Sequence, residues 1–166
     1  REWAPHQDEW NHAGQVSRDI WLKAGREGLL CVTLPTECGG GGGDFGHSAV
    51  IAEEIARAGV GGVSLGLHSD IVAPYIHRLG SEEQKARWLP GICRGEKVLA
   101  IAMTEPGTGS DLQGVRTLAI RDGDSYRLSG SKIFITNGQL CGLVIVACKT
   151  DKAQGAQGIS LIVVET

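Results

Sequence analysis

The spacing of apolar side chains changes near Lys97, and this change limits the possible folds more than any other feature. Before it, apolar residues recur at intervals of three and four, the period of an amphipathic α-helix. After it, apolar and polar residues alternate, the period of a half-buried β-strand. We therefore expect an α+β chain, with an all-helical N-terminal domain over residues 1–96 and an antiparallel β domain over residues 97–166. Strands and helices do not alternate along the chain, which argues against a Rossmann domain.

Three apolar stripes support the helical assignment of the first half, over residues 10–24, 51–58 and 65–79. Ser81-Glu82-Glu83-Gln84 has the spacing of a capping box, so a helix should begin there. Pro90 lies further along that helix. We expect it to kink or end the helix, because proline lacks an N–H and its ring clashes with the preceding turn.

The second half contains a hairpin and several further strand segments. Asp122-Gly123-Asp124 separates two alternating segments, residues 115–121 and 125–129, and this arrangement is a strong hairpin signal. In all we expect about six strands. The others cover residues 98–103, 133–135, 143–147 and 159–164.

Composition and charge exclude several classes of function. The chain has 166 residues and a net charge of −3, and its basic residues are scattered rather than gathered into the stripe that nucleic acids bind. No apolar segment approaches the roughly 20 residues needed to cross a bilayer, and the start of the chain has no signal-peptide core. The five cysteines lack paired spacing, which favours free thiols in a reducing compartment. We expect a soluble intracellular protein with no nucleic-acid site and no membrane span.

Two features invite a ligand-binding interpretation that the sequence does not favour. The run Gly39–Gly43 has the composition of a phosphate loop but lacks the Lys-Ser/Thr ending, so a flexible connection is the better interpretation. The five histidines show no spacing typical of metal ligands, and no metal site is predicted. His68 lies in an apolar helical stripe, where we expect a hydrogen-bonded core histidine rather than a base.

The segment Ile101–Asp111 ends a predicted buried strand in a turn that contains glycine. Glu105 precedes a proline and is therefore kept out of helical geometry. Gly107 and Gly109 have no side chains, so a ligand can approach the backbone amides closely. With three nearby hydroxyl side chains, the segment suits a ligand that has both a hydrogen-bonding ring and phosphates. A purely structural turn is the alternative.

The segment Ser131–Gly138 ends a second predicted strand. Phe134 and Thr136 are two residues apart, so their side chains would share one face of that strand. An aromatic ring beside a hydroxyl suits a flat ligand, which it can cover and bond at the edge. Ordinary core packing is the alternative interpretation of Phe134.

Together the two segments strongly resemble the acyl-CoA dehydrogenase family. The resemblance is carried by Met-Thr-Glu-Pro-Gly-Thr-Gly-Ser-Asp over residues 103–111 and by Leu-Ser-Gly-Ser-Lys-Ile-Phe-Ile-Thr-Asn-Gly over residues 128–138. It extends over nearly the whole chain and is strongest to the long-chain-specific branch. The family fold has a helical N-terminal domain, a central β-barrel-like domain and a C-terminal helical bundle. The resemblance implies that this sequence covers the first two and lacks the bundle, with the β domain incomplete at its C-terminal end.

The resemblance also implies a cofactor, FAD, and the residues that contact it. Thr104 would lie near the flavin ring, and Ser110 near the pyrophosphate, where it also contacts the acyl-CoA substrate. Phe134 would pack against the isoalloxazine, at a position where many relatives carry Trp, and Thr136 would bond the ring edge near the reactive nitrogen. The implied cofactor-binding residues are Ile101, Met103, Thr104, Gly109, Ser110, Phe134, Ile135 and Thr136.

The implied activity is α,β-dehydrogenation of a fatty acyl-CoA to the trans-2-enoyl-CoA in β-oxidation, with electrons passing to an electron-transfer flavoprotein. In the family the catalytic base belongs to the C-terminal bundle, so no residue of this chain is nominated. Its candidate carboxylates are interpreted as solvated: Glu53, Glu54, Glu82, Glu83 and Glu105. The resemblance further implies a homo-oligomer at full length, in the bacterial cytoplasm or alternatively the mitochondrial matrix. An acyl-CoA oxidase and a non-catalytic binding module are the alternatives left open.

Overall fold

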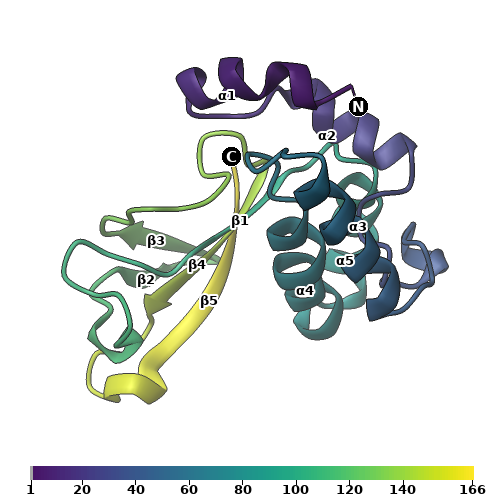
Figure 1. The fold of residues 1–166 in the computed structure, drawn as a ribbon. Helices are drawn as coiled ribbons and strands as arrows, with labels where there is room; N and C mark the ends of the chain where they lie inside the picture. Colours follow the sequence, from purple (N-terminus) through teal and green to yellow (C-terminus); the bar gives the residue numbers. More distant parts are fainter. Residues whose placement is uncertain (1) are drawn as a thin grey trace.

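The computed structural model describes residues 2–166 as a helical part and a sheet part that lie side by side (Figure 1). The last helix ends at Cys93 and the first strand begins at Leu99, so the fold changes from helix to strand where the apolar period changes. The helices are α1 (Gln7–Ala13), α2 (Arg18–Arg26), α3 (Phe45–Arg57), the π-helix η3 (Leu67–Val72), α4 (Ala73–Leu79) and α5 (Glu82–Cys93), and short 3₁₀ turns are η1 (Ala4–His6), η2 (Thr36–Cys38), η4 (Leu112–Gly114) and η5 (Gly155–Gly158). The strands are β1 (Leu99–Ala102), β2 (Leu118–Asp122), β3 (Ser125–Ser129), β4 (Leu143–Lys149) and β5 (Ile159–Glu165).

Local signals in the sequence explain where several helices begin and end. The Ser81 hydroxyl accepts the amide of Gln84 at 3.2 Å and the Gln84 side chain accepts the amide of Ser81 at 2.9 Å, so the predicted capping box starts α5. Gly14 ends α1 in a left-handed conformation, which divides the stripe predicted over residues 10–24 between two helices. Pro90 lies inside α5 but does not end it. None of the helices within residues 2–166 is long and apolar enough to cross a membrane.

One hydrophobic core joins the two parts. Trp21, Leu89 and Ile92 of the helical part are fully buried, and they belong to the same cluster as Leu99 of β1 and Leu143 of β4. The first strands of the sheet therefore pack directly on the helices. Burial of this continuous apolar surface is the main term that stabilises the arrangement.

The sheet is mixed rather than purely antiparallel. The predicted hairpin is present, with β2 and β3 antiparallel across a turn at Gly123, and β4 pairs antiparallel with β5. However, β1 pairs parallel with β4, with Leu99 opposite Leu143, and the first residue of β2, Leu118, pairs in parallel with the last residue of β4, Lys149. The expectation of an all-antiparallel sheet is wrong for these pairs. The long connection from β1 to β4, which contains the hairpin, returns the chain to the end where β1 began, as parallel pairing requires.

The strand predicted over residues 133–135 is absent, and five strands form among the described residues rather than about six. Phe134 has a φ of 57° and Asn137 a φ of 64°, both in the left-handed region, which cannot continue a strand. The interpretation that Phe134 and Thr136 share a strand face is therefore wrong. The residues form an irregular loop whose side chains are directed by its own turns.

The glycine run Gly39–Gly43 is a packed loop, not a flexible connection. A Cβ at Gly40 would lie 2.3 Å from the carbonyl oxygen of Leu34, so glycine is required where the two backbones touch. Because its amides bond to the chain itself, they are not available to a phosphate. The bonds run from Gly40, Gly41, Gly42 and Gly43 to the carbonyl oxygens of Pro35, Cys31, Leu34 and Val32, respectively.

His68 is a core histidine, as its sequence position predicted. It is fully buried, its Nδ1 accepts the amide of Leu99 at 3.1 Å, and its Nε2 lies 3.1 Å from the carbonyl oxygen of Ile92. These partners assign the proton to Nε2, which donates to Ile92. Burial lowers the pKa of His68 to about 4, so the imidazole is neutral.

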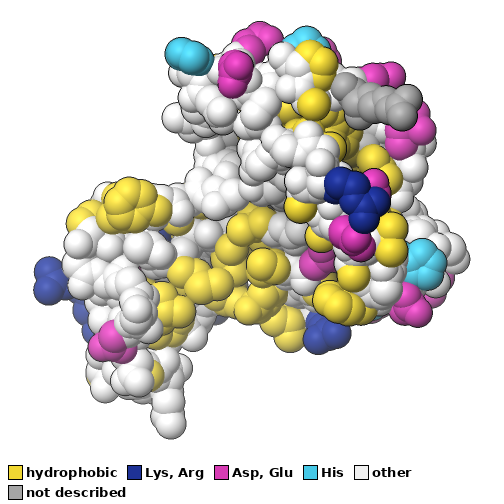
Figure 2. Space-filling view, in the orientation of Figure 1, with side chains coloured by type: hydrophobic (Ala, Val, Ile, Leu, Met, Phe, Trp, Pro, Cys, Tyr) yellow, Lys and Arg dark blue, Asp and Glu magenta, His cyan; other side chains and the backbone are white. Residues whose placement is uncertain are grey.

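An apolar groove follows the junction of the helices and the sheet, and Figure 2 shows hydrophobic side chains gathered over this region. Its volume is about 330 Å³, and its lining includes Tyr75 and Leu79 from the α4 side and Tyr126, Leu161 and Val163 from the sheet. Among the described strands β5 pairs only with β4, so it forms an edge of the sheet next to this groove.

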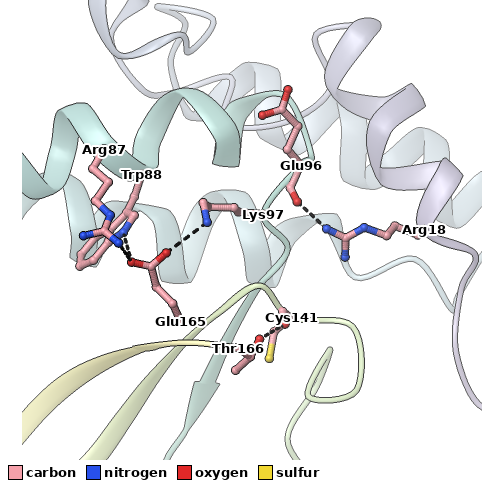
Figure 3. A network of polar contacts seen from close by, with 8 residues as sticks. All are labelled: Arg18, Arg87, Trp88, Glu96, Lys97, Cys141, Glu165 and Thr166. Carbon is pink, nitrogen blue, oxygen red and sulfur yellow. Dashed lines mark hydrogen bonds and ion pairs between the residues drawn. The ribbon is translucent and has the colours of Figure 1, made fainter.

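Polar contacts bind the end of β5 to α5 (Figure 3). The carboxylate of Glu165 accepts the indole N–H of Trp88 at 3.2 Å and pairs with Arg87 at 2.5 Å and Lys97 at 3.3 Å. These contacts fasten the last strand to the helical part at the level of its final residues.

Candidate functional site

The two segments singled out in the sequence lie side by side. The amide of Ile133 donates to the carbonyl oxygen of Thr104 at 3.1 Å, and the ammonium of Lys132 donates to the carbonyl oxygen of Met103 at 2.9 Å. The side-chain amide of Asn137 reaches back to β1, to the carbonyl oxygen of Leu99, at 3.1 Å. The end of β1 and the loop over residues 132–138 therefore form one surface.

The first segment turns back on itself after β1. The amide of Glu105 donates to the carbonyl oxygen of Thr108 at 2.9 Å, and the amide of Thr108 returns the bond at 3.1 Å. Gly107 and Gly109 lie at this turn. A Cβ at either would meet no atom within 4 Å, and neither glycine has a left-handed φ. The fold itself does not require glycine at these positions, so the open space over the backbone is available to a ligand.

Glu105 is buried inside this turn, with 6% of its surface exposed. Its carboxylate accepts the amides of Arg116 at 2.7 Å and Thr117 at 2.8 Å, and pairs with the ammonium of Lys132 at 3.0 Å. Burial by itself would raise the pKa of Glu105, but the donors from Thr117, Arg116 and Lys132 outweigh it and lower the pKa to about 2. The interpretation of Glu105 as a solvated turn residue is therefore wrong. Its role in the structure is to join the turn, the start of β2 and the loop.

The other candidate carboxylates are exposed. Glu53 and Glu54 each pair with Arg57 at 2.7 Å on the surface of α3, and Glu82 and Glu83 lie in the first turn of α5. Within the described part of the chain, no group of three or more His, Cys, Asp or Glu side chains is placed to hold a metal ion.

The second segment presents an exposed aromatic ring beside unpaired donors. Phe134 is 90% exposed, and its left-handed backbone is strained for an aromatic residue. Within residues 2–166, the amides of Phe134, Ile135 and Thr136 and the hydroxyl of Thr136 have no hydrogen-bond partner. Strain of this kind persists where the surroundings hold it and is concentrated at ligand sites. A flat ligand with acceptors at its edge matches this surface.

The structure places the predicted site residues on two adjoining faces. Ile135 and Thr136 line a hollow of about 310 Å³, which is also lined by Val16 and Ser64 of the helical part, whereas Ser110 is not part of its lining. The half-buried members of the predicted set are Ile101, Met103, Thr104 and Ile135, and the exposed members are Gly109, Ser110, Phe134 and Thr136.

Sequence reasoning missed Glu105, Lys132 and Asn137 as the residues that join the two segments. Glu105 comes after the apolar run at residues 98–103, Lys132 comes directly before the apolar residues Ile133 and Phe134, and the two lie 27 positions apart. Opposite charges placed this way could have suggested an ion pair. Asn137 itself has a left-handed backbone, a conformation in which asparagine is enriched.

A flavin fits these residues on two observations. No protein atom would lie within 4 Å of a Cβ at Gly107 or Gly109, so a ligand can lie against the backbone there. The unpaired donors at Ile135 and Thr136 lie beside the exposed ring of Phe134. Acceptors of a ring edge and oxygens of a phosphate are the groups that such donors bind.

Comparison with protein families gives two matches that together cover most of the chain. Residues 1–96 match the model of the acyl-CoA dehydrogenase N-terminal domain, and residues 100–166 match that of the acyl-CoA dehydrogenase middle domain.

The chain is also similar to individual proteins. It is 51% identical over 163 residues to the mitochondrial long-chain specific acyl-CoA dehydrogenase of Sus scrofa, covering 97% of this chain and 38% of that protein. It is 38% identical to a subunit of the caffeyl-CoA reductase–Etf complex of Acetobacterium woodii, covering 95% of this chain and 42% of that protein.

Solved structures show the same relationship. The acyl-CoA dehydrogenase from Geobacillus kaustophilus superimposes with a TM-score of 0.95 at 49% identity, over 99% of this chain and 44% of that one. A glutaryl-CoA dehydrogenase from Mycobacterium smegmatis, in complex with FADH2, does so with a TM-score of 0.86 at 31% identity, over 98% of this chain and 41% of that one. The chain thus spans less than half of the length of each of these proteins.

Proposed function

This chain belongs to the acyl-CoA dehydrogenase family, and from this premise we propose that it forms the flavin-binding face of an enzyme that oxidises fatty acyl-CoA to trans-2-enoyl-CoA. FAD is the cofactor of the family. Bound FAD supplies the hydride acceptor, and the residues of this chain bind and orient it. We also propose that the helical and β domains meet at residues 96 and 97.

The observation that carries the proposal is the contact between the two segments, made by Ile133 with Thr104 and by Lys132 with Met103. It places the exposed ring of Phe134 and the free hydroxyl of Thr136 next to the end of β1. Phe134 would cover the flavin ring, and Thr136 would donate to its edge. Gly109 and Ser110 would offer their free amides to the pyrophosphate, with Ser110 also contacting the acyl-CoA. Ile101, Met103, Thr104 and Ile135 would complete the wall.

We propose that the catalytic base lies outside residues 1–166. The carboxylate of Glu105 is held by three donors and stays ionised and enclosed, so it cannot approach a substrate carbon. A base needs hydrogen-bond reach to the proton it removes. The exposed surfaces of α3 and α5, away from the candidate site, hold the other carboxylates, Glu53, Glu54, Glu82 and Glu83.

The proposed partners follow from relatives. One relative belongs to a reductase–Etf complex, which supports an electron-transfer flavoprotein as the electron acceptor. The similarity to a long-chain specific enzyme supports a long-chain acyl group and a place in β-oxidation. We propose a homo-oligomer, in the bacterial cytoplasm or alternatively the mitochondrial matrix.

The test is the colour of the protein purified at its native length. It should contain FAD, and a long-chain acyl-CoA added without air should bleach the flavin absorbance. Slow reoxidation in air would separate a dehydrogenase from an oxidase, which transfers its electrons to dioxygen. A colourless protein that takes up no flavin on reconstitution would contradict the proposal.

A further inference from the structure

Lys132 is an almost buried cation at the base of the loop over residues 133–138. Its side chain is 12% exposed, and that of Glu105, its partner, is 5% exposed. The ammonium donates to the Glu105 carboxylate at 3.0 Å and to the Met103 carbonyl oxygen at 2.9 Å. A lysine is seldom buried unless it is paired, so the burial of Lys132 indicates a specific role for its contacts.

We propose that Lys132 is a positioning residue that holds the loop over residues 133–138 against the end of β1, so that Phe134 and Thr136 meet the flavin. The inference rests on the proposed function, since it assigns the loop a ligand. It concerns the geometry of the loop, which exists without the ligand and can be measured without it.

The loop depends on few anchors. It lies outside the strands of the sheet, and two of its residues, Phe134 and Asn137, have left-handed backbones. A conformation of this kind must be held by contacts from outside the loop. The contacts to β1 and the turn that follows it are the ammonium of Lys132, the amide of Ile133 and the side chain of Asn137. Lys132 is the only one of the three that carries a charge and binds two acceptors.

The turn to which Lys132 binds is also held by hydrogen bonds that do not involve Lys132. The carboxylate of Glu105 also accepts the amides of Arg116 and Thr117, and the backbone of Glu105 exchanges two hydrogen bonds with that of Thr108. Loss of the ammonium therefore leaves the turn in place and frees the loop. This separates positioning by Lys132 from a general role in stability, which would affect the turn and β2 equally.

The chain offers a matched control. Arg127 and Asp122 form an ion pair at 2.7 Å on the hairpin, with side chains 77% and 61% exposed. Arg127→Met removes one cation and one ion pair from the same domain without touching the loop. Exposed pairs of this type contribute little to stability.

The first measurement is amide hydrogen exchange in the flavin-free protein at native length. In Lys132→Met the two hydrogen-bonded amides of this stretch, those of Ile133 and Gly138, should exchange about ten- to a hundredfold faster than in the wild type, the loss expected for a charge-assisted hydrogen bond. Exchange in β2 should stay the same, and Arg127→Met should match the wild type. Lys132→Arg, which keeps the cation, should exchange more slowly than Lys132→Met. If Lys132→Met does not fold, Lys132→Gln takes its place.

The second measurement is the visible spectrum and affinity of bound FAD, well below the unfolding temperature. Lys132→Met should shift the flavin bands and weaken binding by about tenfold or more, and Arg127→Met should do neither. Wild-type exchange rates in the loop of Lys132→Met would overturn the inference, and so would a less stable variant with an unchanged flavin spectrum. A wild-type protein that binds no flavin would instead overturn the proposed function, and the exchange rates would still decide whether Lys132 holds the loop.

Discussion

The Nδ1 of His68 accepts the backbone amide of Leu99 at 3.1 Å, so a single buried imidazole joins the helical part to the first strand. Its Nε2 faces Ile92 at the end of α5, and both contacts require the neutral ring in one tautomer. A group of this kind connects the stability of the junction to pH.

We expect the free energy of unfolding to fall between pH 6.5 and pH 4 because of His68. An unfolded histidine takes up a proton near pH 6.5, whereas burial lowers the pKa of His68 in the fold to about 4. The contribution is therefore complete above pH 6.5 and is lost as the pH falls towards 4, by up to about 3 kcal/mol. Urea unfolding at pH 7, 5 and 4 measures it. His68→Phe should be less stable at pH 7 and should lose this pH dependence, while the exposed His12→Gln should keep it. Equal slopes for wild type and His68→Phe would refute the assignment.

Glu105 should control a separate, more acidic range. Burial opposes its ionisation, but the hydrogen bonds outweigh burial and lower the pKa from 4.5 to about 2. Its contribution is present above pH 4.5 and is lost as the pH falls through 2. We expect Glu105→Gln to lower the free energy of unfolding at pH 7 by about 2–3 kcal/mol and to flatten the acid limb below pH 4.5. The same titrations measure this, with the exposed Glu83→Gln as the control. An acid limb that is unchanged in Glu105→Gln would contradict it.

Gly109→Ala should separate cofactor binding from stability. The new methyl group would meet no protein atom within 4 Å and the backbone is not left-handed, so the free energy of unfolding should change by less than about 0.5 kcal/mol. If the open backbone holds a phosphate, FAD affinity should fall by about tenfold or more. Titration with FAD followed by flavin fluorescence measures this. Gly130→Ala is the opposite case, because its Cβ would lie 2.3 Å from the Thr117 hydroxyl and should destabilise the protein. Unchanged FAD affinity in Gly109→Ala would show that this turn is not the phosphate site.

Thr136→Val should slow hydride transfer more than it weakens acyl-CoA binding. Valine keeps the shape of the side chain but removes a hydroxyl that has no hydrogen-bond partner within residues 2–166. If that hydroxyl donates to the flavin edge, where negative charge builds up, its loss should slow flavin reduction about ten- to a hundredfold. Stopped-flow reduction at saturating acyl-CoA measures the rate. Ser125→Ala, in the exposed hairpin, is the control, and an unchanged reduction rate in Thr136→Val would show that the role is wrongly assigned.

Residues 1–166 expressed by themselves should self-associate and hold FAD weakly. The edge strand β5 presents unpaired backbone groups beside the apolar groove, and Leu161 on it is 42% exposed. Such edges pair with other chains. Sedimentation should show oligomers or aggregates, reduced by Leu161→Lys, which places a charge on the edge. A stable monomer that binds FAD with sub-micromolar affinity would contradict this prediction and favour a binding module.

Features that depend on residues a few positions apart could be predicted from the sequence. The capping box of Ser81 and Gln84, the hairpin turn at Gly123 and the change of period near Lys97 each follow from local chemistry, and the structure contains all three. The two candidate segments, residues 101–111 and 131–138, were also recognisable, because each is a continuous run with its own composition. The sequence could suggest the contact between these segments, made by Ile133 and Thr104, only through the family resemblance.

The sequence by itself determined the order of helices and strands, the identity of the two segments and the burial of His68, since these follow from periodicity and propensity. Tertiary structure alone decided the parallel pairing of β1 with β4, the left-handed backbone of Phe134 and the burial of Glu105 beside Lys132. Each of these depends on which distant segments meet, and a pattern within one segment does not specify its partner. An ion pair between residues 27 positions apart, or a glycine loop packed on a neighbouring backbone, forms only when the core brings the chain together.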